Sequence, residues 1–376
     1  MSPIVGVIGG GQLARMMIPP AVELGVGIRV FAETRGESAD LAVTATGDFR
    51  NSDEVLAFAR TVDVVTFDHE QVPQSVLADL LAAGVVVRPV PSALLYAQDK
   101  LAMREKLGGL GLPMPEWARV TGIAELAEFL AAHGGRAVLK APRGGYDGRG
   151  VRVVHSAEDA ADWFGDGDAL LVEEHVEFRR ELAQLVARRP SGELTLWPVV
   201  ESVQRNEVCA EVIAPAPLST GRITHVAAEI GTAVANALDV TGVFTVELFE
   251  TTDDRLIINE LAMRPHNTGH WTIEGSITSQ FEQHLRAVLD LPLGSTDARA
   301  PWSVMVNVLG GPSSGSLADE YPRALADQPT VKFHNYGKQS RPGRKVGHVT
   351  ATGSDLDDTV FRARAASEFF AGAPLA

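Results

Sequence analysis

The hydrophobic pattern of the first ninety residues predicts alternating strands and helices. Residues 4–8 form a β-branched run, three glycines follow, residues 12–24 have a helical period, and residues 28–31 form a second apolar run. This order of strand, glycine turn, helix and strand is that of a parallel β-α-β unit. Further strands are expected at residues 62–67 and 85–87, after helices at residues 52–60 and 73–83. We therefore predict a small parallel α/β domain over residues 1–95.

Beyond residue 96 the apolar runs lie too close together for a purely parallel sheet. Pro89 and Pro91 mark the exit from the first domain, and Ser92 is expected to cap a helix that runs to Leu107. Strands are expected at residues 137–140, 151–154, 170–174, 181–188, 243–250 and 256–261, and helices near residues 124–132, 157–163, 225–238 and 277–289. This spacing favours antiparallel pairing around helices, which is an α+β arrangement.

A cluster of proline and glycine at residues 291–301 marks the next boundary, and the rest of the chain looks β-rich. We therefore predict a central domain over residues 96–295 and a small β-rich domain over residues 296–376. A chain of 376 residues is also too long for one compact core, which agrees with several domains.

Charge and cysteine content exclude several classes of partner. The formal net charge is −15, so nucleic acid and anionic membranes are not expected partners, and any anionic ligand needs a local basic patch. The single cysteine, Cys209, cannot form an intramolecular disulfide or a thiolate metal site. There is no uncharged apolar stretch of membrane-spanning length and no basic leader. We expect a soluble, cytoplasmic protein.

The first glycine cluster, Gly9 to Gly11, lies where a strand passes into a helix. With Ala14 it satisfies the dinucleotide pattern G-x-G-x-x-A, and Glu33 ends the next strand where a ribose-binding acid would lie. Any phosphate held on the amides of a helix N-terminus would need the same glycines. A phosphate site, with or without a dinucleotide, and a purely structural turn therefore remain open.

A second glycine cluster follows a strand that ends in Lys140. Residues 144–150 contain four glycines, which would let main-chain amides fold over a polyphosphate while Lys140 reaches a phosphate. The chain contains no Walker A motif. The alternative is a surface hairpin with a solvated lysine beside it.

Two glutamates are predicted to face each other across a hairpin. If the strands at 243–250 and 256–261 turn between Asp253 and Asp254, Glu247 and Glu260 stand opposite each other. Like charges so placed repel unless a cation lies between them, and oxygen ligands suit Mg²⁺ or Mn²⁺ carrying nucleotide phosphates. The alternative is a solvent-facing pair, although the neighbouring residues are apolar.

Two further segments carry candidate binding groups. Residues 264–271 crowd polar side chains into a loop, and Pro265 and Gly269 argue against a helical zinc site built from His266 and His270. Residues 330–348 contain five Lys and Arg side chains and no acid, which suits a phosphate monoester or, alternatively, a solvated basic turn.

In their order and spacing, these motifs resemble those of the ATP-grasp enzymes over nearly the whole chain. The resemblance rests on Gly9 to Leu13, Gly144 to Gly150, Asn259 to Ala262, Arg264 to Trp271 and Arg341 to His348. It implies an N-terminal pre-ATP-grasp domain, a central ATP-grasp domain, a small C-terminal domain and a homodimer. It also implies a ligase that uses ATP with Mg²⁺ or Mn²⁺ to join bicarbonate to the exocyclic amine of aminoimidazole ribonucleotide, through carboxyphosphate.

The resemblance also assigns roles to individual residues. The implied ATP ligands are Lys100, Lys140, Gly145, Tyr146, Asp147, Gly148, Arg149, Gly150, Val151, Glu173, Glu174, His175, Val176, Glu181, Gln204, Asn259 and Glu260. The implied metal ligands are Glu247 and Glu260. The ribonucleotide would be held by Gly11, Gln12, Leu13, Glu70, Asn267, Lys338, Arg344 and Lys345, and bicarbonate by Tyr146, Asp147, Arg149, Arg264 and His266. Gln204 stands where such enzymes more often have histidine.

Three other functions remain possible at this point. An NAD(P)-dependent oxidoreductase would use the first glycine cluster but leaves the paired glutamates and the basic run without a role. A related ligase that joins formate to glycinamide ribonucleotide shares most of the motifs, and residues 267–271 and 341–348 favour the bicarbonate enzyme over it. A non-catalytic nucleotide sensor could be built on the same scaffold, although the expected charged residues are all present.

Overall fold

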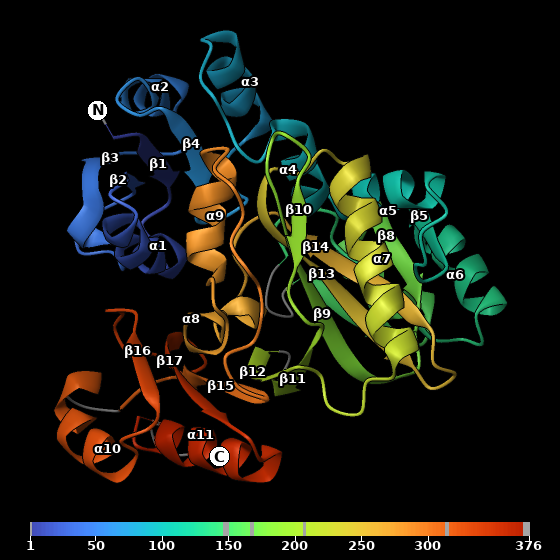
Figure 1. Ribbon diagram of the computed structural model, residues 1–376. Coiled ribbons are helices and arrows are strands. Elements are labelled where there is room, and N and C mark those ends of the chain that lie inside the picture. The colour runs from blue at the N-terminus through green and yellow to red at the C-terminus, as the bar shows by residue number, and fades with distance from the viewer. Residues whose placement is uncertain (1, 146–149, 166–168, 206–207, 313–315, 371–376) are drawn as a thin grey trace.

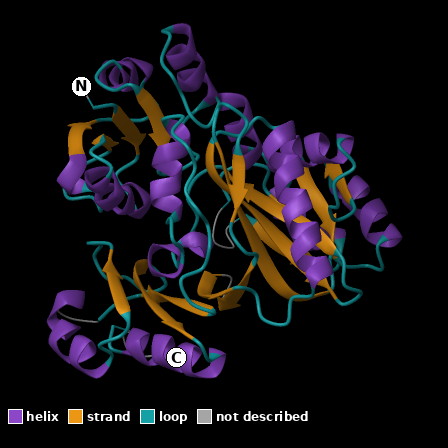
Figure 2. Ribbon diagram, in the orientation of Figure 1, coloured by secondary structure: helices purple, strands orange, loops and turns teal. Residues whose placement is uncertain are grey.

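A computed structural model of the chain describes residues 2–145, 150–165, 169–205, 208–312 and 316–370. These residues form three sheets with helices packed on them (Figure 1, Figure 2). The N-terminal part lies against one flank of a large central sheet, and a smaller sheet lies at the opposite flank. The predicted combination of α/β and α+β architecture is confirmed. No helix in the described part of the chain is long and apolar enough to cross a membrane.

The N-terminal sheet is parallel, with the strand order β3-β2-β1-β4. Its strands are β1 (Ile4–Ile8), β2 (Gly27–Ala32), β3 (Val43–Thr46) and β4 (Val64–Phe67), and its helices are α1 (Gln12–Glu23), α2 (Ser52–Ala59) and α3 (Gln74–Ala82). The sequence analysis missed β3, because this edge strand has four residues and only Val43 is buried. The strand expected at residues 85–87 is a single bridge between Val65 and Val87.

The single helix expected from Ser92 to Leu107 is two helices, α4 (Pro91–Gln98) and α5 (Lys100–Gly109). Asp99 separates them with an extended backbone, and its side chain accepts a hydrogen bond of 3.0 Å from the Ala102 N–H. The predicted cap at Ser92 was also wrong, because α4 begins at Pro91 with Val90 at the N-cap position. The break at Asp99 places Lys100 in the first turn of α5, where its side chain reaches the site described below.

The small sheet is antiparallel, with the order β5-β8-β6-β7. Its strands are β5 (Trp117–Val120), β6 (Ala137–Lys140), β7 (Val151–Val154) and β8 (Leu170–Glu174), and α6 (Ile123–Ala132) packs on it. Leu126 and Leu130 of α6 bury their side chains against Leu139 and Val172 of the sheet. This packing fixes the strand end at which Lys140 lies.

The large sheet has the order β14-β13-β9-β11-β12-β15-β17-β16, and β10 pairs with β9. Its strands are β9 (Phe178–Arg188), β10 (Leu194–Leu196), β11 (Val200–Arg205), β12 (Val208–Ala214), β13 (Gly242–Thr251), β14 (Leu256–Ala262), β15 (Trp302–Leu309), β16 (Lys332–Asn335) and β17 (Lys345–Gly353). The pairing of β12 with β15 joins the C-terminal strands to the central ones. The C-terminal region is β-rich as predicted, but its strands extend the central sheet instead of forming a separate one.

The remaining helices are α7 (Gly221–Ala237), α8 (Thr272–Gly275), α9 (Gln280–Val288), α10 (Tyr321–Asp327) and α11 (Leu356–Glu368). Helix α7 packs on β9 and β13, and α11 packs on β15 and β17. Helix α9 lies between α1 and the large sheet, so it touches both the N-terminal part and the centre (Figure 1).

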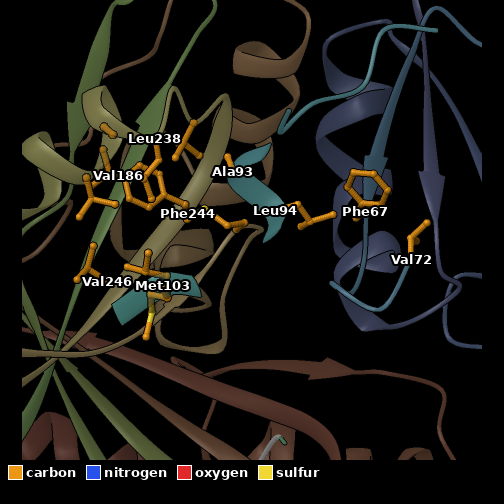
Figure 3. Close-up of a cluster of buried hydrophobic side chains, with 14 of the residues drawn as sticks. Phe67, Val72, Ala93, Leu94, Met103, Val186, Leu238, Phe244 and Val246 are labelled. Carbon is orange, nitrogen blue, oxygen red and sulfur yellow. The ribbon is translucent and has the colours of Figure 1, made fainter. Parts of the chain in front are cut away.

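One hydrophobic cluster runs from the N-terminal sheet into the large sheet (Figure 3). Phe67 of β4, Leu94 of α4, Met103 of α5 and Phe244 of β13 are all fully or almost fully buried in it. Burying one such side chain contributes roughly 1.5–3 kcal/mol. The cluster therefore holds the N-terminal part against the central sheet and fixes the cavity between them.

Candidate active site

Strands β13 and β14 carry the two predicted carboxylates. The pairs Val246↔Leu261 and Leu248↔Ile258 flank a β-bulge, so Glu247 lies across from both Asn259 and Glu260. The prediction that Glu247 and Glu260 face each other across this hairpin is confirmed, but the sequence analysis did not foresee the bulge. With the extra residue, Asn259 lines the same cavity as the two glutamates.

Each carboxylate has a cationic or protonatable partner. Glu247 Oε1 lies 3.1 Å from His266 Nε2, and Glu260 Oε2 lies 3.4 Å from Lys100 Nζ. Burial raises the pKa of Glu247, but the hydrogen bond and charge of His266, together with the positive charges of Lys345 and Arg264, hold that pKa below its ordinary value. Glu247 is therefore ionised at neutral pH.

Beneath the bulge, a buried ring of charges joins α5, β6, β8 and β14. Arg104 Nε donates to Glu173 Oε1 at 2.5 Å, and Glu173 Oε2 lies 2.7 Å from Lys140 Nζ. Lys140 donates to Asn259 Oδ1 at 3.2 Å, and Arg104 closes the ring by donating to the carbonyl oxygens of Ile258 and Asn259. The ring fixes Lys140 and the bulge relative to each other.

Arg104 was missed by the sequence analysis, although a signal was present. Its side chain is fully buried, and it lies on the same helical face as Leu101 and Leu107. An arginine on an apolar helix face needs a buried partner, here Glu173. The two cations lower the pKa of Glu173 although its burial acts in the opposite direction.

Glu181 and Gln204 lie side by side on β9 and β11. Gln204 Nε2 donates to Glu181 Oε2 at 3.1 Å. Burial, followed by the negative charge of Glu247, raises the pKa of Glu181 to about 7. The Gln204 amide partly offsets this shift because it donates to the carboxylate.

A cavity of about 520 Å³ opens over these groups. Phe178 and Phe249 of the large sheet give this cavity an apolar wall, with their ring centroids 4.5 Å apart, and Val138 and Val153 of the small sheet also line it. The predicted ATP and metal ligands that line this cavity are Lys100, Lys140, Gly145, Val151, Glu173, Glu174, His175, Val176, Glu181, Gln204, Glu247, Asn259 and Glu260. An apolar slot beside lysines and carboxylates has the composition that a purine nucleotide with its phosphates requires.

A second cavity, of about 840 Å³, lies between the N-terminal part and the loop after β14. Among its walls are Gln12, Leu13 and Lys338, and Lys338 Nζ donates to Gln12 Oε1. The two cavities share the residues Glu70, Ala97, Lys100, Gly145, Arg264, His266, Asn267 and Lys345. The two cavities therefore meet at these shared residues, which form the junction.

At the junction, Glu70 orients Arg264. Arg264 Nε donates to Glu70 Oε2 at 2.6 Å, and Glu70 Oε1 accepts the Met263 N–H at 3.2 Å. Because Glu70 follows β4 and Arg264 follows β14, this pair connects the N-terminal part to the central sheet. The family resemblance implies that the two residues bind different substrates, whereas in the structure they pair with each other.

The first glycine cluster has a structural role that sequence analysis did not reveal. Asp68 Oδ1 accepts the Ala14 N–H at 2.8 Å, and a Cβ atom on Gly11 would lie 2.0 Å from Asp68 Oδ2. Only glycine leaves room for this carboxylate at the start of α1. Burial of Asp68 raises the pKa of its carboxyl. The dinucleotide-like pattern at residues 9–14 is thus compatible with a helix whose N-terminus already holds a carboxylate.

Asn267 makes a reciprocal amide pair with Asn307 of β15. Asn267 Nδ2 donates to Asn307 Oδ1 at 3.0 Å, and Asn307 Nδ2 donates to Asn267 Oδ1 at 2.7 Å. Asn307 also donates to the Cys209 carbonyl oxygen, so it fixes the loop against β12. Asn307 was not predicted from the sequence, because it is one of only two polar residues in the apolar strand β15.

The remaining predicted site residues do not line either cavity or are not described. Arg344 donates to the Gln339 carbonyl oxygen at 3.3 Å and, with Gly11 and Gly150, is not among the lining residues. Tyr146, Asp147, Gly148 and Arg149 lie outside the described residues.

Comparison with known proteins gives the same picture along the whole chain. Residues 1–98 match the ribonucleotide synthetase preATP-grasp domain, residues 105–281 the ATP-grasp domain, and residues 303–361 the phosphoribosylaminoimidazole carboxylase C-terminal domain. The N5-carboxyaminoimidazole ribonucleotide synthase of Mycobacterium bovis is 47% identical over 98% of this chain and 88% of the relative.

Solved structures are similar over the same length. The N5-carboxyaminoimidazole ribonucleotide synthetase of Thermus thermophilus has a TM-score of 0.88 and 34% identity, over 99% of this chain and 100% of that one. The Aspergillus clavatus synthase in complex with ADP and 5-aminoimidazole ribonucleotide has a TM-score of 0.88 and 33% identity, over 98% of each chain.

The sheet arrangement, the paired carboxylates and the nucleotide-sized cavity define an ATP-grasp enzyme, which is an ATP-dependent ligase. Within that class, the chain belongs to the N5-carboxyaminoimidazole ribonucleotide synthase family.

Proposed function

We propose that this chain uses ATP to carboxylate the exocyclic amine of 5-aminoimidazole ribonucleotide with bicarbonate, in purine biosynthesis. The products are 5-(carboxyamino)imidazole ribonucleotide, ADP and phosphate. The observation that carries the proposal is the junction, where the nucleotide-sized cavity meets a larger one beside Arg264, His266 and Lys345. The Mycobacterium bovis relative is named as a synthase of N5-carboxyaminoimidazole ribonucleotide, and the Aspergillus clavatus structure contains ADP and 5-aminoimidazole ribonucleotide.

ATP occupies the smaller cavity in this proposal. The adenine lies against the apolar wall that includes Phe178 and Phe249, and the strand end at Glu173 to Val176 offers main-chain groups to its edge. Glu181 accepts hydrogen bonds from the ribose hydroxyls, while Lys100 and Lys140 neutralise phosphate charge. The glycine segment from Gly144, including Gly145 to Val151, closes over the phosphates and keeps water out.

Mg²⁺ or Mn²⁺ fits the oxygen ligands at the bulge. Glu247, Glu260 and Asn259 present two carboxylates and one amide oxygen to the cavity. Within the described residues, no group of three or more His, Cys, Asp or Glu side chains could hold a metal by itself. Two carboxylates are enough for Mg²⁺, which takes its other ligands from nucleotide phosphates and water. When bound, the ion supplies charge stabilisation to the transferring phosphoryl group.

The ribonucleotide occupies the larger cavity. Its 5′-phosphate meets the main-chain amides of Gln12 and Leu13 at the start of α1, together with Lys338. Lys345 and Asn267 lie at the junction, between this phosphate site and the ATP cavity. Arg344 contributes positive charge from the same basic segment, and Gly11 lets the chain turn into α1.

The junction is suited to the chemistry of bicarbonate. Bicarbonate is a poor electrophile, and its phosphorylation gives carboxyphosphate, which can release CO₂ and phosphate beside the amine. The amine nitrogen then forms a bond to the CO₂ carbon and loses one proton. Arg264, held by Glu70, and Lys345 stabilise the negative charge of these species. Tyr146, Asp147, Arg149 and His266 complete the bicarbonate site in this proposal.

A comparison of two substrate pairs tests the function. We expect ADP release and incorporation of labelled bicarbonate to depend on aminoimidazole ribonucleotide, with one carboxylated product per ADP. Formate with glycinamide ribonucleotide should give neither. Turnover with the formate pair alone would reject the proposal in favour of the related ligase.

We further propose a homodimer, a cytoplasmic location and three domains at residues 1–95, 96–295 and 296–376. A sedimentation measurement on the purified chain tests the oligomeric state. The one cysteine, Cys209, is buried, which is compatible with a reducing compartment.

A further inference from the structure

The main chain of His266 is held on both sides by one buried side chain, that of Gln280. Gln280 Oε1 accepts the His266 N–H at 2.9 Å, and Gln280 Nε2 donates to the His266 carbonyl oxygen at 2.8 Å. The Gln280 side chain is fully buried, and its Nε2 also lies 2.9 Å from Nδ1 of His270. All the polar atoms of Gln280 are thus used to hold the loop after β14.

The helix that carries Gln280 is itself fixed to both halves of the molecule. Gln280 begins α9, and its own N–H donates to Thr272 Oγ1 at 2.9 Å. One turn later, His284 Nδ1 accepts the Val243 N–H from β13 at 3.0 Å. Since Nδ1 is an acceptor, Nε2 carries the proton and donates to Thr66 Oγ1 of β4 at 2.7 Å. Gln280 therefore holds His266 relative to both cavities.

The imidazole of His266 lies at the junction, where a small displacement would matter. Its Nε2 lies 3.1 Å from Glu247 Oε1, and its Nδ1 lies 2.9 Å from Thr268 Oγ1. The ring belongs to the walls of both cavities. A shift of the His266 ring would change the geometry of the junction and leave the apolar side chains of the smaller cavity in place.

We propose that Gln280 is a positioning residue that fixes the position of His266 at the junction. In this way ATP cleavage stays coupled to carboxylation of the amine. The inference rests on the proposed function and adds to it a residue that touches no substrate. Gln280 lines neither cavity, so its effect must pass through the residues that it holds, chiefly His266, which lines both cavities, and also His270, which lines the larger one. A displacement of about 1 Å at a reacting centre can cost on the order of 10²-fold in rate.

Helix α9 supplies a matched control in Gln283. This side chain is also fully buried, and it also holds one residue on both sides: Gln283 Nε2 donates to the Gly294 carbonyl oxygen and Oε1 accepts the Gly294 N–H, both at 2.8 Å. Gly294 is not part of either cavity. Gln280→Met and Gln283→Met therefore remove the same kind of contact from the same helix, and only the first contact leads to the junction.

The experiment measures ADP, carboxylated product and melting temperature for the full-length wild type and both variants. We expect both variants to lose a similar few degrees of Tm. Gln280→Met should lower kcat by roughly tenfold or more and release more than one ADP per product, with the KM for ATP changed by less than about twofold. Gln283→Met should keep the wild-type kcat and one product per ADP.

A second variant keeps the test decisive if Gln280→Met does not fold. Gln280→Glu keeps the shape and the acceptor for the His266 N–H, but it replaces the donor to the His266 carbonyl oxygen by an acceptor. It should show the same uncoupling. Wild-type kcat and coupling in a folded Gln280 variant, or equal losses in Gln283→Met, would overturn the inference. A wild type that makes no carboxylated product would instead reject the proposed function.

Discussion

Glu247 and Glu260 should each be essential for turnover but not for folding. Replacing either by glutamine removes one negative charge from the bulge, where the metal is proposed to bind, and leaves the side-chain volume unchanged. We expect kcat to fall on the order of 10²-fold or more, with Tm changed by only a few degrees. Steady-state kinetics at saturating ATP and Mg²⁺ measure this. Glu229→Gln on the exposed face of α7 is the control. Near-normal activity in both bulge variants would contradict the assignment of Glu247 and Glu260 as metal ligands.

Glu181 should make the stability of the metal-free protein depend on pH. Its pKa is raised to about 7, mainly by burial, so the folded state binds a proton over a range where the unfolded carboxyl has lost it. Stability therefore falls as pH rises from about 4.5 through about 7. In Glu181→Gln this loss is absent. We therefore expect the Tm of the variant minus the Tm of the wild type, both measured in EDTA, to increase from pH 5 to pH 8. A constant difference would contradict the raised pKa.

Sequence alone could identify most charged residues of the site but not their pairing. Glu247, Glu260 and Lys140 follow from strand patterns and motif order, because strand ends and hairpins are local features. Asp68 gave no such signal, since only the folded chain shows that it fills the space beside Gly11. The glycine cluster could therefore be assigned to anion binding but not to the carboxylate that already lies there.

At the scale of elements, the buried ring makes α5 a structural support for the site. Arg104→Met would leave the buried Glu173 with Lys140 as its remaining cation among the ion pairs described above. Losing one partner of a buried ion pair costs about 3–5 kcal/mol. Arg119→Met is the control, because Arg119 and Glu105 form an exposed pair at 2.7 Å, worth about 0–1 kcal/mol. Urea denaturation of both variants measures the difference, and equal losses would show that the ring contributes no more than a surface pair.

Element boundaries were predictable where the signal was local and long enough. A turn centred between residues 253 and 254 correctly predicts the pairs Val246↔Leu261 and Thr245↔Ala262, but on the turn side of the bulge the pairs are shifted by one residue, as in Leu248↔Ile258. The helix from residue 92 could not be seen to break, because Asp99 ends one helix and caps the next within a continuous polar and apolar pattern. Strand β3 was too short and too exposed to be distinguished from a loop.

At the scale of the whole molecule, two cavities with different walls predict separable effects on the two substrates. Lys338 lines only the larger cavity and donates to Gln12, so it is proposed to bind the ribonucleotide phosphate. Phe178 lines only the smaller cavity, where it is proposed to contact adenine. The family resemblance already implied a role for Lys338 at the ribonucleotide, whereas Phe178 was not predicted, and the folded chain places it in the smaller cavity.

Lys338→Met should therefore raise the KM for the ribonucleotide by roughly tenfold or more, since a hydrogen bond to a charged group is worth about 1.5–3 kcal/mol.

Phe178→Ala should raise the KM for ATP by roughly tenfold, the equivalent of about 1.4 kcal/mol. Phe178 is exposed, so the fold should survive its truncation. Initial rates with one substrate varied and the other saturating separate the two constants. Because the cavities share only the junction, neither variant should move the other substrate's KM by more than about twofold. A Lys338 variant that changes only the KM for ATP would exchange the two assignments, since the cavity between α1 and the loop after β14 would then hold the nucleotide.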